Sequence, residues 1–121
     1  MRYEYVVTNE YLAEKGLDLN EYALDGTAIP SLINIALDLL VTRICYLDDN
    51  ICCEEDIENY LDKNTNRVGA FLKAQYRILY NLIFLNETSP TDPFVDNIIS
   101  HELGLGKING WQKGIYYRHN R

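Results

Sequence analysis

The order of apolar and polar residues predicts helices over most of the first hundred positions. The strongest pattern covers about residues 30–48, where apolar residues occupy nearly every side of a helix. A single polar stripe remains, formed by Asn34, Asp38 and Thr42 at a spacing of four residues. A helix that is apolar on nearly every side is normally wrapped by its neighbours. We therefore expect residues 30–48 to form the central helix of the fold.

A second long helix is predicted for about residues 67–85. Its buried side is expected to comprise Phe71, Leu72, Gln75, Ile78, Leu79, Leu82 and Ile83. Lys73, Arg77 and Asn81 form a polar stripe at a spacing of four residues. The two long helices should therefore pack together through apolar faces and keep one polar side each.

Shorter helices are marked by their boundary residues. Thr8 can cap a helix over residues 9–15, which Gly16 ends. Residues 54–63 are amphipathic, and Thr91 with Pro93 indicates a further helix that ends before Gly104. The stretch "LDLNEYALDGTAIP" is predicted to be a loop, with a tight turn at its Asp-Gly pair. The expected fold is all-α, a small bundle of four to five helices.

The end of the chain has a different pattern, which begins within "HELGLGKINGW" at residues 101–111. Gly104 and Gly106 free the backbone after the last helix, and Asn109-Gly110 is a strong hairpin signal. The following "GKINGWQKGIYY" alternates enough for a short β-like segment. We therefore expect a helical bundle over residues 1–102 and an extended or β-hairpin-like C-terminal arm over residues 103–121.

The same glycine-rich stretch contains fragments of three catalytic or nucleotide-binding motifs, and each is incomplete. A zinc-protease helix needs a second histidine four residues after His101, where Leu105 stands. A dinucleotide fingerprint needs a glycine in place of Asn109 and a strand before it. A phosphate-binding loop needs Ser or Thr after Lys107, where Ile108 stands. We therefore interpret the stretch as a structural connection between the last helix and the C-terminal arm.

The three cysteines do not have the spacing of a metal site. Cys52 and Cys53 are adjacent, whereas thiolate ligands of zinc are usually separated by two or more residues. The odd count and the adjacent pair also favour a reducing compartment over disulfides. Cys45 is expected to be a small buried hydrophobe. The acidic run "DDNICCEEDIENYLDK" lacks the alternating ligands and central glycine of a calcium loop. No metal or other cofactor is expected.

Charge is distributed unevenly along the chain. The protein has 121 residues, 47% of them apolar, and a formal net charge of −7, which argues against general nucleic-acid binding. Residues 1–102 hold seven Lys and Arg against 18 Asp and Glu, a formal charge of −11. Residues 103–121 hold four Lys and Arg and no acid, a formal charge of +4. The arm is therefore either a solvated tail or a segment that docks on an acidic surface, its own or a neighbour's.

If the arm docks on an acidic surface, its aromatic and basic residues are expected to make the contact. Tyrosine and tryptophan supply buried contact area at interfaces, and cations steer encounter with acidic partners. The predicted partner-binding residues are Lys107, Ile108, Trp111, Lys113, Ile115, Tyr116, Tyr117 and Arg118.

The sequence also favours a cytoplasmic origin. No run of about 18 uncharged apolar residues occurs, so no membrane span and no membrane partner are expected. The first five residues carry Arg2 and Glu4 and no apolar stretch typical of a signal peptide.

The two long helices resemble those of a known group of proteins. The stretches "PSLINIALDLLVTRICYLDD" and "VGAFLKAQYRILYNLIFLNE" are similar to helices of small head–tail connector proteins of tailed bacteriophages. A lysine-alanine-glutamine stretch followed by a tyrosine is common in that family; here Lys73-Ala74-Gln75 precede Tyr76 and Tyr80. The resemblance covers roughly residues 30–85. It implies a small α-helical bundle that assembles as a ring beneath the portal and carries no catalytic residues.

This resemblance implies a non-enzymatic structural protein of the virion. Its partners would be other copies of itself, the portal protein and tail or neck proteins, with no sequence-specific nucleic acid. It would be made in the cytoplasm of the host bacterium and end in the neck of the virion. The Cys52-Cys53 pair and the long arm after Gly104 depart from the family pattern.

Two other classes of function remain open. An acidic phage-encoded inhibitor, or another binding module that mimics nucleic acid, would suit the −11 of residues 1–102. A small enzyme is disfavoured, since no base–nucleophile pair or metal-ligand constellation occurs in the sequence.

Overall fold

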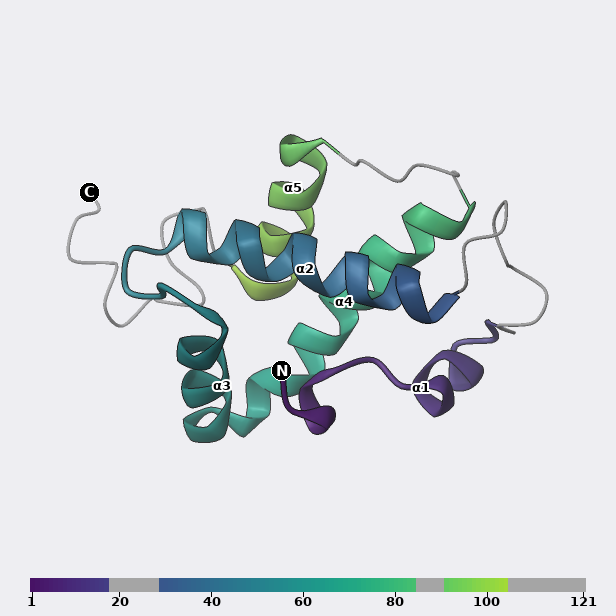
Figure 1. Cartoon of the computed structure of the whole chain (residues 1–121), viewed down its shortest axis with the longest axis horizontal. Helices are drawn as coiled ribbons and strands as arrows, with labels where there is room; N and C mark the ends of the chain where they lie inside the picture. The colour runs from purple at the N-terminus through teal and green to yellow at the C-terminus, as the bar shows by residue number, and fades with distance from the viewer. Residues whose placement is uncertain (18–28, 85–90, 105–121) are drawn as a thin grey trace.

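Five α-helices and two short 3-10 helices make up the described parts of the chain. The computed structural model describes residues 1–17, 29–84 and 91–104 (Figure 1). Its elements are η1 (Tyr3–Tyr5), α1 (Asn9–Glu14), α2 (Ile29–Leu47), α3 (Glu54–Lys63), η2 (Thr65–Arg67), α4 (Val68–Phe84) and α5 (Asp92–Leu103). Helices hold 80% of the described residues and strands hold none of them, which confirms the all-α prediction. The predicted turn at Asp25-Gly26 and the predicted arm from residue 105 onward lie outside the described residues.

Helix ends follow the predicted capping residues. Thr8 and Thr91 each accept a hydrogen bond through Oγ1 from the backbone N–H three residues further on, at 3.1 and 3.4 Å. Gly16 follows α1 with φ of +81°, and Gly104 follows α5 with φ of +73°, a left-handed conformation that glycine adopts without a Cβ clash. Leu103 is the last residue of α5 and is fully buried, so the helical bundle extends one residue beyond the predicted boundary at 102.

The core forms where α4 packs against both α2 and α5, which also contact each other (Figure 1). The buried residues of α2 lie four apart and are Leu32, Ala36, Leu40 and Ile44. Those of α4 are Phe71, Ala74, Gln75, Ile78, Leu79, Leu82 and Ile83. Those of α5 are Val95, Ile98, Ile99 and Leu103. In α4, Leu72, which was predicted to be buried, is only partly buried, and Ala74 lies in the core instead. Each of the three helices thus contributes one stripe to a shared core, as helical periodicity requires.

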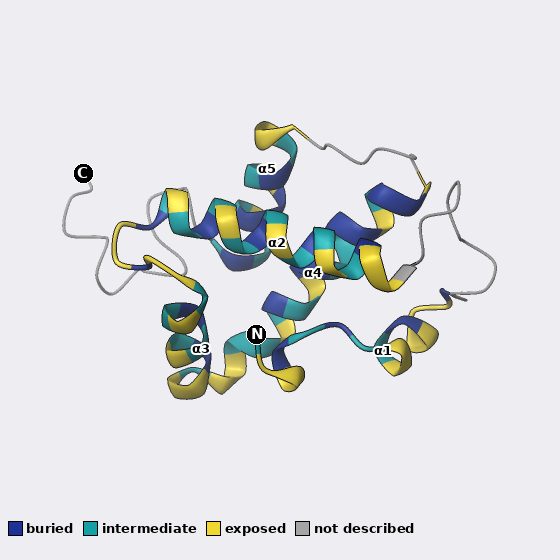
Figure 2. Ribbon diagram, viewed as in Figure 1, coloured by how far each residue is buried: buried dark blue, intermediate teal, exposed yellow. Residues whose placement is uncertain are grey.

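The helix α2 is less enclosed than its composition predicts. Only 22% of the stretch Pro30–Leu47 is buried, because α4 and α5 pack on one side of it and the other side faces solvent (Figure 2). Asn34, Asp38 and Thr42 are exposed as predicted, and Tyr46 continues their stripe. The expectation of a helix wrapped on nearly every side is therefore wrong.

The same stretch passes a simple test for a membrane span. By length and composition, Pro30–Leu47 is apolar enough to cross a bilayer, with a mean hydropathy of 1.4. The core helix of a helical bundle passes this test too, so the finding is weak evidence for a membrane. In the bundle, the buried stripe of this helix lies against α4 and α5.

One buried amide attaches the N-terminal segment to α4. Gln75 is 1% exposed; its Oε1 accepts from the Val7 backbone N–H at 3.2 Å, and its Nε2 donates to the Tyr5 carbonyl at 2.7 Å. The side chain thereby satisfies two backbone groups that would otherwise be buried without partners. Sequence periodicity places Gln75 on the buried side, but the pairing with Tyr5 and Val7 requires the tertiary structure.

Asp48 ends α2 as a buried turn residue. It is 1% exposed, and its Oδ1 accepts from the backbone N–H of Asn50 at 2.8 Å. Its carbonyl accepts from the N–H of Ile51 at 3.0 Å, which turns the chain toward α3. This member of the acidic run is therefore structural and adds little to the accessible acidic surface.

The first prediction concerns the shared core. We expect Leu40→Ala or Leu79→Ala to lower the free energy of unfolding by about 2–5 kcal/mol, because each substitution leaves a cavity at a site 0–1% exposed. Thr42→Ala, at an exposed position of the same helix, is the control. Urea denaturation measures the three variants. A loss below about 0.5 kcal/mol at both leucines would contradict this description of the core.

The second prediction concerns Gln75. Gln75→Leu keeps the approximate size of the side chain and leaves the Val7 N–H and the Tyr5 carbonyl without their partner. We expect a loss of about 1–3 kcal/mol in the free energy of unfolding, the usual cost of buried polar groups left unsatisfied. Hydrogen exchange should show faster exchange of the Val7 amide in particular. Unchanged protection of that amide would rule out the attachment.

Candidate functional site

The residues predicted to bind a partner all belong to the C-terminal arm. Lys107, Ile108, Trp111, Lys113, Ile115, Tyr116, Tyr117 and Arg118 all lie outside the described residues. The candidate site is the surface of the bundle that could receive such a segment. Three features of that surface bear on the question: the pairing of charges, the N-terminal segment on α3, and two hollows along α5.

Most arginines of the bundle are engaged by its own acids or backbone. The described residues hold seven Lys and Arg and 14 Asp and Glu. Arg43 donates to Asp96 through Nε at 2.5 Å and Nη2 at 2.9 Å, and Arg77 donates to Glu102 at 2.8 Å. These pairs join α2 and α4, respectively, to α5. Arg67 donates to the Leu103 carbonyl at 2.8 Å and so holds the last turn of α5.

The pairing leaves a surplus of acids on the surface. Among the described residues, exposed acids for which no side-chain ion pair is found include Glu10, Glu14, Asp38, Asp49 and Glu55. Because the four arginines of the described residues are already engaged within the fold, the surplus negative charge of the bundle is available to a cationic partner.

The N-terminal segment lies against α3 through charged groups. Arg2 and the Tyr5 hydroxyl both donate to Oδ1 of Asp62, and the backbone N–H of Arg2 donates to Glu58 Oε2 at 2.6 Å. The Met1 amine pairs with Glu54 at the start of the same helix. The hydrogen bonds from Arg2 and then Tyr5 hold the pKa of Asp62 below its ordinary value of 3.8. Three carboxylates of α3, those of Glu54, Glu58 and Asp62, are therefore already paired within the fold.

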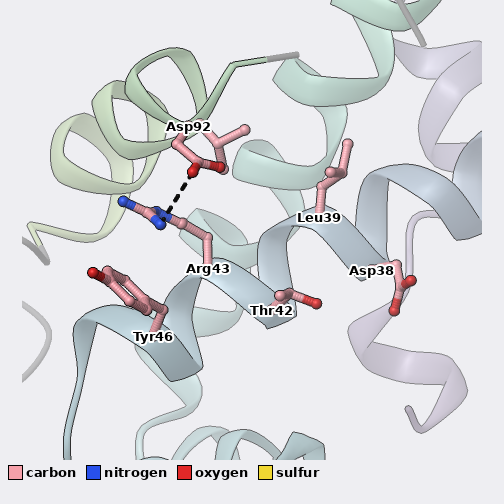
Figure 3. A pocket seen from close by; sticks show the side chains of 7 residues that line it. Asp38, Leu39, Thr42, Arg43, Tyr46 and Asp92 are labelled. Carbon is pink, nitrogen blue, oxygen red and sulfur yellow. Dashed lines mark ion pairs between the residues drawn. The ribbon is translucent and has the colours of Figure 1, made fainter. Parts of the chain in front are cut away.

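A hollow between α2 and α5 is the first candidate for binding (Figure 3). Its volume is about 290 Å³, and it is lined by Asp38, Leu39, Thr42, Arg43, Tyr46, Asp92 and Val95. The guanidinium of Arg43 lies 4.3 Å from the centre of the Tyr46 ring and 3.5 Å from Asp92. The hydrogen bond from Arg43 to Asp96, followed by the charges of Asp96 and Asp92, raises the pKa of Arg43. The hollow thus combines an aromatic ring, a fixed cation and several carboxylates.

A second hollow lies between α4 and α5. Its volume is about 210 Å³, and it is lined by Tyr76, Arg77, Tyr80, Asn81, Phe94 and Ile98. Its tyrosines belong to a row of rings along one side of the bundle, with centroid distances of 6.2 Å (Tyr11–Tyr76), 6.1 Å (Tyr76–Tyr80) and 4.2 Å (Tyr80–Phe84). No acid lines this hollow. It is an aromatic surface flanked by a cation.

The cysteines lie near the junction of α2 and α3. Cys45 is half-buried and packs against the core, whereas Cys52 and Cys53 are exposed, and all three are free thiols. Burial, followed by the nearby Cys53 and Asp56, raises the pKa of the Cys45 thiol. Within the described parts of the chain, no group of three or more His, Cys, Asp or Glu is placed to hold a metal ion.

The third prediction concerns the acid dependence of the Asp62 contacts. Because the folded pKa of Asp62 is below its unfolded value, its carboxylate stabilises the fold above pH 3.8, and this contribution disappears as pH falls through the folded pKa. We expect Asp62→Asn to lower the thermal midpoint at pH 7 and to have a much smaller effect once the pH is low enough to protonate Asp62 in the folded protein. Glu55→Gln, in the same helix, is the control. Thermal melts that show an equal deficit at both pH values would contradict the assignment.

Comparison of the chain with models of protein families, with curated proteins and with solved structures gave no match. The residues and their geometry are therefore the basis for assigning a function.

Proposed function

We propose that the protein is a non-enzymatic structural protein of a tailed-phage virion, a connector subunit that assembles as a ring between portal and tail. The resemblance of residues 30–85 to small head–tail connector proteins suggests this role. The helical bundle is compatible with it, since the resemblance implies a bundle of this kind. The proposed partners are other copies of the chain, the portal protein and tail or neck proteins. The proposed location is the neck of the virion, after synthesis in the host cytoplasm.

The observation that carries the proposal is the separation of charge between bundle and arm. Four arginines of the bundle are engaged within the fold, and exposed acids remain in surplus. Residues 105–121 contain Lys107, Lys113, Arg118 and Arg121 and no acid. A chain that has an acidic body and a basic end is complementary to other copies of itself. Complementary charge steers encounter, and the aromatic residues of the arm would supply the buried contact area.

An acidic inhibitor that mimics nucleic acid is the alternative function. The exposed acids of α3 and of the turn before it, Asp49 and Glu55 among them, favour it. Such a protein would act as a monomer on a basic partner, and its own basic arm would have no part in binding. The oligomeric state of the purified chain therefore separates the two proposals.

The fourth prediction tests assembly through the arm. We expect the full chain to form particles of several copies in sedimentation velocity experiments, and a chain ending at Gly104 to remain a folded monomer. The truncation is placed after Gly104 because Leu103 is buried and its carbonyl is bound by Arg67. In the full chain, Trp111→Ala should weaken assembly more than Lys113→Ala, since a central aromatic contact is usually worth more than a charge at the rim.

Circular dichroism of the truncated chain serves as the control for folding. A truncated chain that assembles normally, or that loses its helical signal, would contradict the proposed role of the arm. A full chain that stays monomeric at all concentrations would favour the inhibitor.

A further inference from the structure

The hollow between α2 and α5 presents a firmly held aromatic ring to solvent. Tyr46 is 70% exposed, and its ring stacks on the Arg43 guanidinium at 4.3 Å. Arg43 is itself fixed by two hydrogen bonds to Asp96, and its side chain is only 20% exposed. Figure 3 shows its ion pair with Asp92 on the other side of the guanidinium from α2. A ring supported in this way loses little conformational freedom when a partner covers it. Tyr46 is therefore suited to serve as a platform for an apolar or cationic side chain.

The charges around the platform favour a cation. The hollow and its edge contain three carboxylates, those of Asp38, Asp92 and Asp96, against the single guanidinium of Arg43. Asp96 neutralises that guanidinium at close range, whereas Asp92 is 73% exposed and lies 3.5 Å from it. Asp38 lies on the exposed stripe of α2, and no ion pair is found for it among the described residues. The surplus charge of the hollow is therefore negative and accessible.

The second hollow, between α4 and α5, does not favour a cationic partner. Arg77 lines it and no acid does. The carboxylate nearest to Arg77, Glu102, accepts its hydrogen bond at 2.8 Å and has a side chain only 11% exposed. A basic segment would gain stacking on Tyr80 there but would meet Arg77 in the lining and find no free carboxylate, because Glu102 is already paired with Arg77. Of the two hollows, the one around Tyr46 is the better match for a basic, aromatic segment.

The chain itself contains such a segment. Residues 105–121 combine four cations and no acid with Trp111, Tyr116 and Tyr117. These 17 residues have a contour length of roughly 55 Å, enough to bridge to a neighbouring subunit.

The position of the hollow on α5 favours binding between copies. Gly104 follows the C-terminal end of α5, whereas Asp92 and the hollow lie at its N-terminal end. These ends are about 18 Å apart in a helix of 12 residues, so about the first six residues of the segment, Lys107 among them, would only span the return to the chain's own hollow. Arm-to-hollow contact between copies is heterologous, and such contacts close into rings when the rotation between subunits allows.

We propose that the hollow around Tyr46 receives the basic segment 105–121 of a second copy of the chain. This inference rests on the proposed assembly role and adds the receiving surface to it. Lysine or arginine side chains of the segment pair with Asp38 and Asp92, and one of its aromatic side chains covers Tyr46. The contact repeats from subunit to subunit, because every copy presents one arm and one hollow.

A charge exchange in the full chain tests the inference. One variant carries Asp38→Lys and Asp92→Lys in the hollow, and the other carries Lys107→Glu and Lys113→Glu in the arm. We expect each alone to raise the dissociation constant of self-association at least about tenfold in sedimentation velocity experiments. An equimolar mixture of the two should regain assembly, because each arm then meets a hollow of opposite charge.

Control variants separate this effect from general changes in charge or folding. Glu10→Lys with Glu14→Lys makes the same change in net charge at exposed positions of α1 and should leave assembly unchanged. Tyr46→Ala should weaken assembly, whereas Tyr3→Ala, at a tyrosine that is 73% exposed, should not. Tyr46→Ala also keeps the test valid if Asp92→Lys disturbs the start of α5.

The outcomes distinguish this inference from the proposed function. Normal assembly of both Tyr46→Ala and the hollow variant would overturn the docking site and leave the connector role standing. Recovery in one chain that carries all four substitutions, without recovery in the mixture, would place the arm in its own hollow and overturn binding between copies. A monomeric wild-type chain would overturn the connector role and this inference together.

Discussion

The contact of α4 with both α2 and α5 is the arrangement on which the rest of the molecule depends. Apolar stripes from the three helices meet in one core, in which Leu40, Leu79 and Ile99 are at most 1% exposed. Because side chains in such a core interlock, the direction in which α5 crosses α2 is set by this packing. The crossing brings Asp96 within hydrogen-bond distance of Arg43 and opens the hollow beside Tyr46. The candidate site is therefore a consequence of the core.

Charged side chains hold the periphery of this core together. Arg43 and Arg77 reach α5 from two different helices, and Arg67 holds the carbonyl at its end. Partly exposed ion pairs at the edge of a core add only modest stability, because water screens them and the side chains lose freedom. Their larger effect is on the charge of the accessible surface. Cations used inside the bundle no longer balance the exposed acids, so the bundle offers negative charge to any cationic partner.

The proposed assembly depends on the division of the chain into an acidic helical bundle and a basic C-terminal arm. A bundle with a fixed aromatic platform presents the same surface in every copy, so this surface needs little ordering when a partner binds. Association driven by such complementarity should weaken as salt concentration rises.

How much could be predicted from the sequence differs between helices and surfaces. Periodicity and capping residues determined the helices: Thr8, Thr91 and Gly104 mark boundaries that the structure confirms, because caps act within a few residues of the chain. The same local spacing predicted six of the seven buried residues of α4; Ala74 was missed, and Leu72, which was predicted, is only partly buried. The exposed stripe of Asn34, Asp38 and Thr42 on α2 was also predictable from the sequence. Tyr46 is the next position at the same spacing of four residues.

Only the tertiary structure decided which surfaces meet. The pairing of Arg43 with Asp96 joins residues 53 positions apart, and that of Gln75 with Tyr5 joins residues 70 positions apart. Local propensity carries no information on such pairs, since they form only after helices have packed. For the same reason the sequence overstated the burial of α2: its apolar composition was visible, but the number of helices that cover it was not. Composition determined that the bundle is acidic, whereas the packing of α2 on α5 decided that Asp38 and Asp92 line one hollow together with the exposed ring of Tyr46.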